Sequence, residues 1–420
     1  MMNKSLLALY AYKSGDLVHA REHEKCCGGW ETNKLGFKWS NRHHPRDKML
    51  FDALVTIISL QLGRLPVAVA QRSDVKCYLS LLAKTSSTAG SVGHTSEADL
   101  LIHAYRMCHD EVHKIMDARV ALLSDALPLL EDATHDYRAR TDEDMRRTFN
   151  VLTQACNAIR SLTQYRAAAD ANALVPQLHK DLTTFIPALY NKDHIALLDR
   201  VAQRVITGAL VEVCLLSRAL EDTIEVAMVD RGFRALLHKG IHCDWIDPAP
   251  PVAVAITLNE PSLEELRSSS PALDGVSSDD IVRRLNEKLK AGTRFRTNRG
   301  ITDLGKVPPT FKFQVSTHCE AALIAHFANR NIESTLYIAS APPACYSCYL
   351  LAEAMREVEG GIRFQLEPYS GVIDCGWRLP SELSHMVNVG KTMLSKSDAH
   401  LKAAVDATRK VKVPYDDEDW

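Results

Sequence analysis

The stretch from Thr317 to Cys348 constrains the fold of this chain most, because metal-binding residue types recur in it at a specific spacing. His318 is followed two residues later by Glu320, and a Cys345-x-x-Cys348 pair follows 27 residues after the histidine. One imidazole nitrogen and two sulfurs are three ligands, the set with which a catalytic zinc keeps a fourth position for water. The stretch therefore predicts a zinc site made of His318, Cys345 and Cys348, with Glu320 free to transfer protons.

The residues around these ligands predict helices and strands in a fixed order. A helix is expected from Ser316 or Thr317, which can cap it, and the β-branched, apolar run 335–339 is typical of a buried parallel strand. A second helix is expected to begin at the cysteines. Both ligand groups then lie at helix N-termini, where the positive end of the helix dipole favours thiolates. We therefore expect strand, helix, strand, helix and strand between Phe311 and Glu367, with the metal between two helix ends.

Other interpretations of the same residues remain open. Thr317 and Glu320 also have the spacing of a capping box, in which the glutamate only satisfies backbone donors at the start of a helix. The two cysteines could be reduced core residues. The set could also be a structural zinc site whose fourth ligand is Cys375, Cys319 or a distant histidine. We favour the catalytic site because it explains all of these residues together. A capping box would not explain the two cysteines, and a pair of core or structural cysteines would not explain Glu320.

Residues 317–380 resemble the fungal branch of the cytidine-deaminase-like superfamily, the nucleic-acid/nucleotide deaminase-like domains. The resemblance covers 64 of the 420 residues. The matching residues are His318-Cys319-Glu320, Cys345-Tyr346-Ser347-Cys348, Gly371 and Trp377-Arg378-Leu379-Pro380. Two positions depart from the family pattern: Ala344 stands where a proline precedes the first cysteine, and Cys319 stands where a small residue is usual.

The resemblance implies a zinc-dependent hydrolytic deaminase that acts on a nucleobase in a nucleotide or a single-stranded nucleic acid. In the expected reaction, zinc-activated hydroxide attacks the amino-bearing ring carbon, and Glu320 moves the proton. Trp377 is a candidate for lining or backing the base pocket, with a core tryptophan as the alternative. The basic loop with Arg294, Arg296 and Arg299 is a candidate for binding phosphate, with a solvated loop as the alternative.

A second hypothesis comes from a different class of protein. The chain could be a non-catalytic interaction protein, in which a helical domain binds a protein partner and the zinc only stabilises the fold. The fourth zinc ligand separates the two hypotheses, because water in that position favours an enzyme and a side chain favours a structural site. A domain that keeps the fold and the zinc without activity is a further alternative.

Composition places the chain among ordinary globular proteins. Of its 420 residues, 46% are hydrophobic and 24% charged, and the formal net charge of −2 provides no overall attraction to nucleic acid or membrane. No apolar run approaches the length of a membrane span, and eleven scattered cysteines suit a reducing compartment. We therefore expect an intracellular protein, cytoplasmic or nuclear, that does not contact membranes.

The pattern along the chain predicts an α+β protein with an all-α N-terminal helical bundle and a C-terminal three-layer α/β/α domain of the cytidine-deaminase-like type. The expected segments are an irregular N-terminus (1–45), a helical domain (46–245), a Pro/Ser-rich linker (246–280), a zinc domain (281–412) and an acidic tail (413–420). Within the helical domain, cysteines 108, 156 and 214 fall on apolar faces and are expected in the core.

Two other groups have a spacing that could bind a metal. His109 and His113 lie four residues apart on an expected helix, and His19, His23, Cys26 and Cys27 lie near the N-terminus. We interpret both groups as surface residues, because the first lacks the glutamate of a metalloprotease helix and adjacent cysteines do not readily share one ion.

Overall fold

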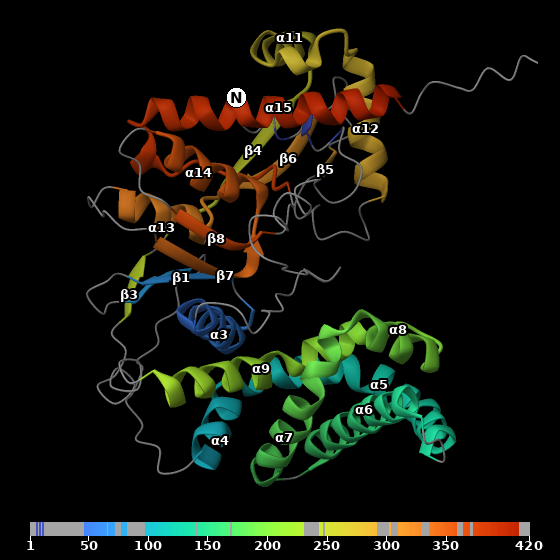
Figure 1. Ribbon diagram of the computed structural model, residues 1–420. Helices are drawn as coiled ribbons and strands as arrows, with labels where there is room; N and C mark the ends of the chain where they lie inside the picture. Colours follow the sequence, from blue (N-terminus) through green and yellow to red (C-terminus); the bar gives the residue numbers. More distant parts are fainter. Residues whose placement is uncertain are drawn as a thin grey trace, which may run out of the picture. The chain divides into compact units, whose positions relative to one another are not determined.

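The computed structural model is that of an α+β chain, mostly helical with two small sheets (Figure 1). It describes residues 6, 8, 9, 11, 46–64, 66–71, 77–81, 97–138, 142–168, 170–230, 243–246, 248–291, 302–303, 310–328, 336–358, 364–369 and 373–410. Within these ranges no helix combines the length and the apolar character that crossing a membrane requires.

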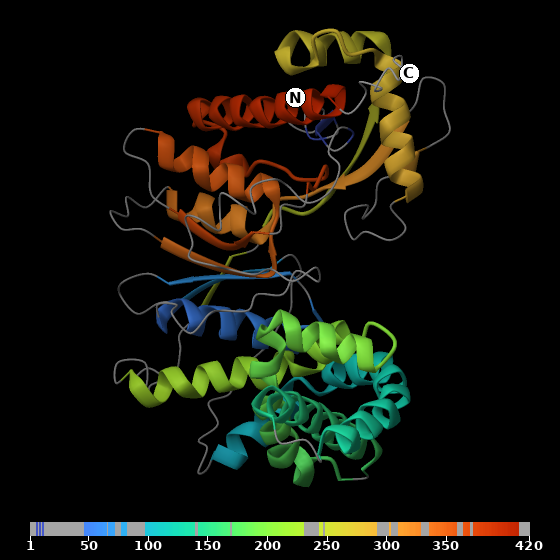
Figure 2. The same cartoon turned by 45° about the vertical axis from the view of Figure 1, so that its right-hand side comes forward.

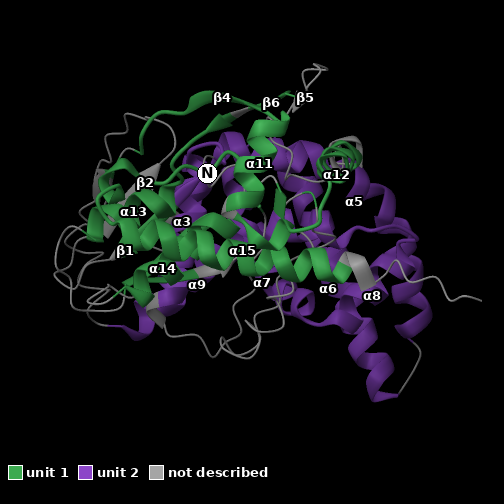
Figure 3. Cartoon of the chain, turned by 90° about the horizontal axis from the view of Figure 1, so that it is seen from above, with its two compact units in different colours: residues 1–32, 68–82, 243–420 green, residues 33–67, 83–242 purple. Residues whose placement is uncertain are grey.

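The chain divides into two compact units (Figure 3). Unit 1 comprises residues 1–32, 68–82 and 243–420, and unit 2 comprises residues 33–67 and 83–242. This division differs from the predicted one, because residues 68–82 group with the C-terminal part instead of with the helices around them. The reason is packing: Ala68 and Ala70 are fully buried in the hydrophobic core of unit 1.

Unit 2 is the helical part expected from the sequence. Its helices are α3 (Arg46–Gln61), α4 (Glu97–Met107), α5 (His109–Arg138), α6 (Glu143–Ala167), α7 (Val175–Phe185), α8 (Lys192–Val201) and α9 (Thr207–Val229). Their apolar faces form one core that includes Leu152, Phe185 and Leu210. Cys108, Cys156 and Cys214 are buried in it as free thiols, which confirms their prediction as core residues.

The long apolar stretch from Ile195 forms two helices, α8 and α9. The Asp199 carboxylate near the end of α8 accepts hydrogen bonds from the backbone N–H groups of Ile206 (2.9 Å) and Thr207 (3.0 Å). These groups begin α9, so Asp199 acts as its cap and stabilises a break in the helix that the hydrophobic pattern alone does not reveal.

Unit 1 contains a five-stranded sheet with the order β3-β2-β1-β7-β8. Its strands are β1 (Val67–Gln71), β2 (Cys77–Leu81), β3 (Cys243–Ile246), β7 (Leu336–Ala344) and β8 (Phe364–Tyr369), and the β2–β3 and β7–β8 pairs are parallel. A second, antiparallel sheet has the order β4-β6-β5, with β4 (Val252–Thr257), β5 (Thr302–Asp303) and β6 (Thr310–Val315).

The predicted alternation around the metal-binding residues is present. β6 is followed by α13 (Cys319–Ala328), β7, α14 (Tyr346–Glu357) and β8. The pairing differs from a single sandwich sheet, however, because β6 belongs to the second sheet, and the neighbour of β7 on the side away from β8 is β1. Strands from distant parts of the chain therefore complete the sheet that carries β7.

The segment predicted as a Pro/Ser-rich linker is folded and contributes to the core of unit 1. It holds β4, α11 (Glu260–Ser269), the 3₁₀ turn η3 (Pro271–Leu273) and the start of α12 (Ser278–Ala291). Asn259 caps α11 by accepting a hydrogen bond from Ser262 N at 3.0 Å, and Pro261 lies in its first turn, where a missing N–H costs nothing. Leu263 and Leu273 are buried.

Two terminal segments also pack on unit 1. Leu6 and Leu9 lie in helical backbone and are fully buried in the core, although the sequence suggested an irregular N-terminus. The C-terminal helix of the described residues is α15 (Val387–Lys410), which lies along α14 in both views of the molecule (Figures 1 and 2). Its Val389, Met393 and Leu401 are buried against the core.

Candidate metal centre

The structure brings together the three residues predicted as metal ligands. One nitrogen of His318 and the sulfurs of Cys345 and Cys348 lie within 4.8 Å of one another. The closest measured approach is 3.4 Å, between Cys345 Sγ and His318 Nδ1. Both cysteines are buried, and the His318 side chain is 16% exposed. A nitrogen and two sulfurs at this spacing could bind a metal ion.

The two helices of the site place these ligands. His318 directly precedes α13, and its carbonyl accepts a hydrogen bond from Ala322 N at 2.9 Å. Cys345 is the extended N-cap residue of α14, directly after β7, and Cys348 lies in the first turn of that helix. All three ligands therefore lie at helix N-termini, where unpaired backbone N–H groups favour thiolates over thiols. α13 and α14 are in contact in the fold (Figure 1).

Glu320 lies beside the ligand group and is buried. Its Oε2 accepts a hydrogen bond from Cys348 Sγ at 3.6 Å. The Thr317 hydroxyl, which a capping box requires, has no hydrogen-bond partner among the described residues. A capping box with Thr317 therefore does not account for Glu320. The Glu320 carboxylate instead contacts the sulfur of Cys348.

Burial and neighbouring charges set the protonation of this site. Burial lowers the pKa of His318, but the Cys345 charge and Asp374 outweigh it and hold the pKa well above its usual value. Burial raises the pKa of Cys345, yet its hydrogen bond with Cys348 and the charge of His318 bring that pKa down to about 5. Burial, followed by the hydrogen bond with Cys345, raises the pKa of Cys348. Because a metal binds the deprotonated form of each of these groups, metal binding at this site would release protons.

Glu320 also has a shifted pKa. Burial raises it above the usual range of a glutamate, and the positive charge of His318 offsets part of this effect. A buried carboxyl group with a raised pKa can hold and release a proton nearer neutral pH than an exposed one, which is the property that general acid–base chemistry requires.

Two residues contact the ligands from a segment after β8. Asp374 Oδ2 lies 3.1 Å from His318 Nε2, and the Trp377 indole N–H donates to Cys348 Sγ at 3.3 Å. Trp377 is buried in the hydrophobic core of unit 1, as the alternative of a core tryptophan expects, and its role in a base pocket stays a prediction. Asp374 had no assigned role in the sequence; the available signal was a carboxylate three residues before that tryptophan.

The candidate donor set consists of one nitrogen and two sulfurs. Among the residues that the structure describes, the group has three members, and neither Cys319 nor Cys375 joins it, although both are buried. Two thiolates and one imidazole are ligands typical of zinc. Cys319 and Cys375 therefore do not complete a four-ligand site. The third alternative, a distant histidine, falls in part outside the described residues.

Other predicted residues lie apart from this centre or outside the described ranges. His109 and His113 stack with ring centroids 4.1 Å apart, but they form no metal-binding group with other described residues. Arg294, Arg296 and Arg299 fall outside the described residues, as do His19, His23, Cys26 and Cys27.

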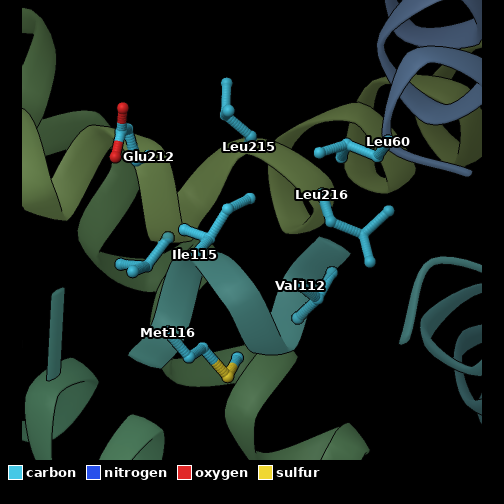
Figure 4. A pocket seen from close by; sticks show the side chains of 8 residues that line it. Leu60, Val112, Ile115, Met116, Glu212, Leu215 and Leu216 are labelled. Atoms are coloured by element: carbon cyan, nitrogen blue, oxygen red, sulfur yellow. The ribbon is translucent and has the colours of Figure 1, made fainter. Parts of the chain in front are cut away.

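Unit 2 contains a small cavity between α3, α5 and α9 (Figure 4). Apolar side chains such as Ile115, Met116 and Leu216 line it, together with Glu212. Its volume of about 10 Å³ is near the lower limit for a single water molecule. Glu212 is already bound by Arg119, with Nε 2.6 Å from Oε2. The cavity is too small to hold a nucleobase.

Comparisons of the chain with family models, with curated proteins and with solved structures found no match. The resemblance of residues 317–380 to the deaminase-like domains accordingly stays a prediction. The chemistry of this chain is inferred from its own residues.

Proposed function

We propose that this chain is a zinc-dependent hydrolytic deaminase that acts on a nucleobase in a nucleotide or a single-stranded nucleic acid. The observation that carries the proposal is the convergence of His318, Cys345 and Cys348, with the buried carboxylate of Glu320 beside them. A purely structural zinc site has no need of a buried glutamate that is not one of its ligands. A hydrolytic site needs such a group to handle protons.

The surrounding fold supports the proposal. The alternation of α13, β7, α14 and β8, with ligands at the N-termini of both helices, is the arrangement expected of a cytidine-deaminase-like domain. β1, β2 and β3 extend the sheet beyond β7, and a sheet of five strands is wide enough for helices to cover its faces in an α/β/α architecture. We assign that architecture to unit 1 as part of the same proposal.

Zinc is the cofactor we propose, held by His318, Cys345 and Cys348. When bound, it supplies Lewis-acid chemistry that makes water a nucleophile at neutral pH. Glu320 then accepts the proton of the attacking water through its carboxylate and passes it to a ring nitrogen of the base. The same carboxylate next takes the second proton of that water, from the hydroxyl group now bonded to the ring carbon, and delivers it to the amino group. The C–N bond then breaks, a carbonyl forms at the ring carbon and ammonia leaves. Burial of Glu320 excludes bulk water from this transfer.

The test combines metal analysis with a product screen. The full chain is purified, its zinc content is measured, and ammonia release is followed with free nucleosides, nucleotides, single-stranded DNA and single-stranded RNA. We expect a zinc content near one per chain and ammonia release with at least one of these classes. Glu320→Gln is the matched control, because it keeps the volume of the side chain and removes its acid–base function.

We expect Glu320→Gln to lower the turnover rate by about 10²–10⁴-fold while zinc remains bound. Loss of zinc from a correctly folded Glu320→Gln protein would instead identify Glu320 as a ligand and contradict its proposed role. Ammonia release that is unchanged in this variant would contradict the mechanism.

The alternative is an interaction protein with a structural zinc site, and one observation favours it. Cys345, Cys348 and Glu320 are each no more than 7% exposed, as is common where a metal only stabilises a fold. The discriminating measurement is X-ray absorption spectroscopy of the zinc-loaded chain. A shell of one nitrogen, two sulfurs and one light exchangeable ligand supports the enzyme, and a third sulfur supports the structural site.

A further inference from the structure

Residues 373–378 contact two of the candidate metal ligands. This backing segment supplies two contacts to two different ligands. Asp374 Oδ2 lies 3.1 Å from His318 Nε2, and Trp377 Nε1 lies 3.3 Å from Cys348 Sγ. His318 faces Cys345 with its other nitrogen, since Nδ1 lies 3.4 Å from the Cys345 sulfur.

We propose that Asp374 and Trp377 are positioning residues that prepare the site for its metal, an inference that rests on the proposed zinc site. Asp374 fixes the imidazole with the proton on Nε2, which leaves the lone pair of Nδ1 directed at the metal position. Trp377 donates to Cys348 and so stabilises that sulfur as a hydrogen-bond acceptor. Each residue acts through a ligand side chain: Asp374 through His318 and Trp377 through Cys348.

The chemistry of each contact supports its role. A neutral imidazole donates from one nitrogen and accepts at the other, so a carboxylate at Nε2 selects Nδ1 as the ligand atom. Such carboxylate–histidine pairs orient histidine ligands and make them more basic. The indole N–H is a donor only, so the sulfur facing it must accept. A thiolate accepts this bond better than a thiol, and the thiolate is the form that binds a metal.

The backing segment is itself held against the start of α13. Ser316 N donates to Gly376 O at 2.7 Å, and Arg378 N donates to Ser316 O at 2.9 Å. Gly376 N also donates to Asp374 Oδ1 at 2.8 Å, which leaves the second carboxylate oxygen of Asp374 for His318. These bonds connect the positioning residues to the backbone two residues before His318. The orientation of the imidazole is therefore fixed by the fold before any metal arrives.

The test measures zinc affinity directly in the full chain. Zinc is titrated against a chromophoric chelator with the wild type and with Asp374→Asn, Asp374→Ala and Trp377→Phe. Cobalt(II) absorption reports the geometry of the same site. We expect the zinc Kd to rise by about 10–100-fold in Asp374→Ala, with part of the affinity recovered in Asp374→Asn, which keeps an acceptor oxygen. We expect Trp377→Phe to raise the Kd by about 10-fold and to shift the cobalt–sulfur absorption band.

Two control variants remove comparable bonds elsewhere in unit 1. Thr257→Val removes the hydroxyl that bonds Thr310 Oγ1 at 3.0 Å, and Asp398→Asn alters the carboxylate that bonds Ser270. These controls should lower the thermal stability of the metal-free chain at least as much as Asp374→Asn and Trp377→Phe do, yet leave the zinc Kd unchanged. If the backing segment had only a structural role, control variants that cost as much stability should weaken zinc binding as much as Asp374→Asn and Trp377→Phe do.

The outcomes separate this inference from the proposed function. A wild-type zinc Kd in Asp374→Ala and Trp377→Phe overturns the positioning roles and leaves the deaminase proposal intact. Weakened zinc binding in these variants, in a chain that releases no ammonia from any substrate class, supports the positioning roles and removes the deaminase. A wild-type chain that takes up no zinc overturns both. Asp374→Asn is nearly isosteric, so it decides the question if Asp374→Ala fails to fold.

Discussion

At the scale of single residues, unit 2 contains a carboxylate that is destabilised by its own burial. Asp222 on α9 is 8% exposed and pairs with Arg218, with 2.8 Å between Oδ2 and Nε. Burial raises the pKa of Asp222 from 3.8 to about 6, and the charge of Arg218 offsets only part of this effect. The folded protein therefore keeps Asp222 protonated up to a higher pH than the unfolded chain does.

This shift predicts how stability depends on pH. Because the folded pKa of Asp222 is above the unfolded value, its contribution to stability is complete below about pH 4 and is lost as the pH rises through about 6. Asp222→Asn keeps a neutral acceptor and should raise the free energy of unfolding by about 1–3 kcal/mol at pH 8. Urea denaturation should show this gain at pH 8 and none at pH 4. A variant less stable than the wild type at pH 8 would show that the Arg218 pair outweighs the cost of burial.

At the scale of elements, the close packing of the backing segment on β6 depends on a residue without a side chain. A Cβ placed on Gly376 would lie 2.2 Å from the backbone oxygen of Gln314, which is closer than real Cβ atoms approach. Gln314 belongs to β6. Ser316, directly after that strand, forms an isolated β-bridge with Trp377 of the backing segment. Any side chain at position 376 must therefore displace the segment that contacts His318 and Cys348.

We expect Gly376→Ala to lower the free energy of unfolding by about 2 kcal/mol or more, because a backbone atom cannot move aside as a flexible side chain can. It should also weaken zinc binding. Gly390→Ala is the matched control: nothing lies within 4 Å of an added Cβ at that position in α15, so the variant should be neutral or about 0.5–1 kcal/mol more stable. Thermal unfolding and zinc titration of both variants provide the check. Equal stabilities of the two would contradict the close approach at Gly376.

The elements also show how far sequence reasoning extends. α13, β7 and α14 could be predicted because capping residues, an apolar run and the ligand spacing lie within 32 residues of chain. β1 could not be placed, because its partner β7 lies more than 260 residues later and a five-residue apolar strand carries no signal for a distant partner. The position of Asp374 was hidden for the same reason: a hydrogen bond to His318 depends on folding and not on spacing.

Proline and serine content was misleading in residues 246–280. Those residue types favour a linker, but Pro261 and Pro271 lie in the first turns of α11 and η3, where proline is compatible with helical backbone. Leu258, Leu263 and Leu266 bury their side chains in the same segment. A leucine every few residues between the prolines was the signal for a folded segment.

At the scale of the whole molecule, the order of strands makes unit 1 discontinuous in sequence. β1 and β2 lie between β3 and β7 in the five-stranded sheet, and they are formed by residues 67–71 and 77–81. A fragment of residues 243–420 keeps every proposed ligand and the backing segment, but it lacks the two central strands. β3 would have no neighbour and β7 would have an unpaired edge, with buried backbone groups left unsatisfied.

We therefore expect residues 243–420, expressed alone, to fold poorly and to bind zinc at least 10-fold more weakly than the full chain. The conformational entropy lost when an unfolded site becomes ordered reduces the free energy of zinc binding. Circular dichroism melting and zinc titration of the fragment provide the measurement. The control is the same fragment with residues 66–82 joined to its N-terminus through a flexible linker, which returns β1 and β2 and should recover part of the affinity. Cooperative unfolding and full zinc affinity of the shorter fragment would mean that β1 and β2 are dispensable, and that the metal centre depends on residues 243–420 alone.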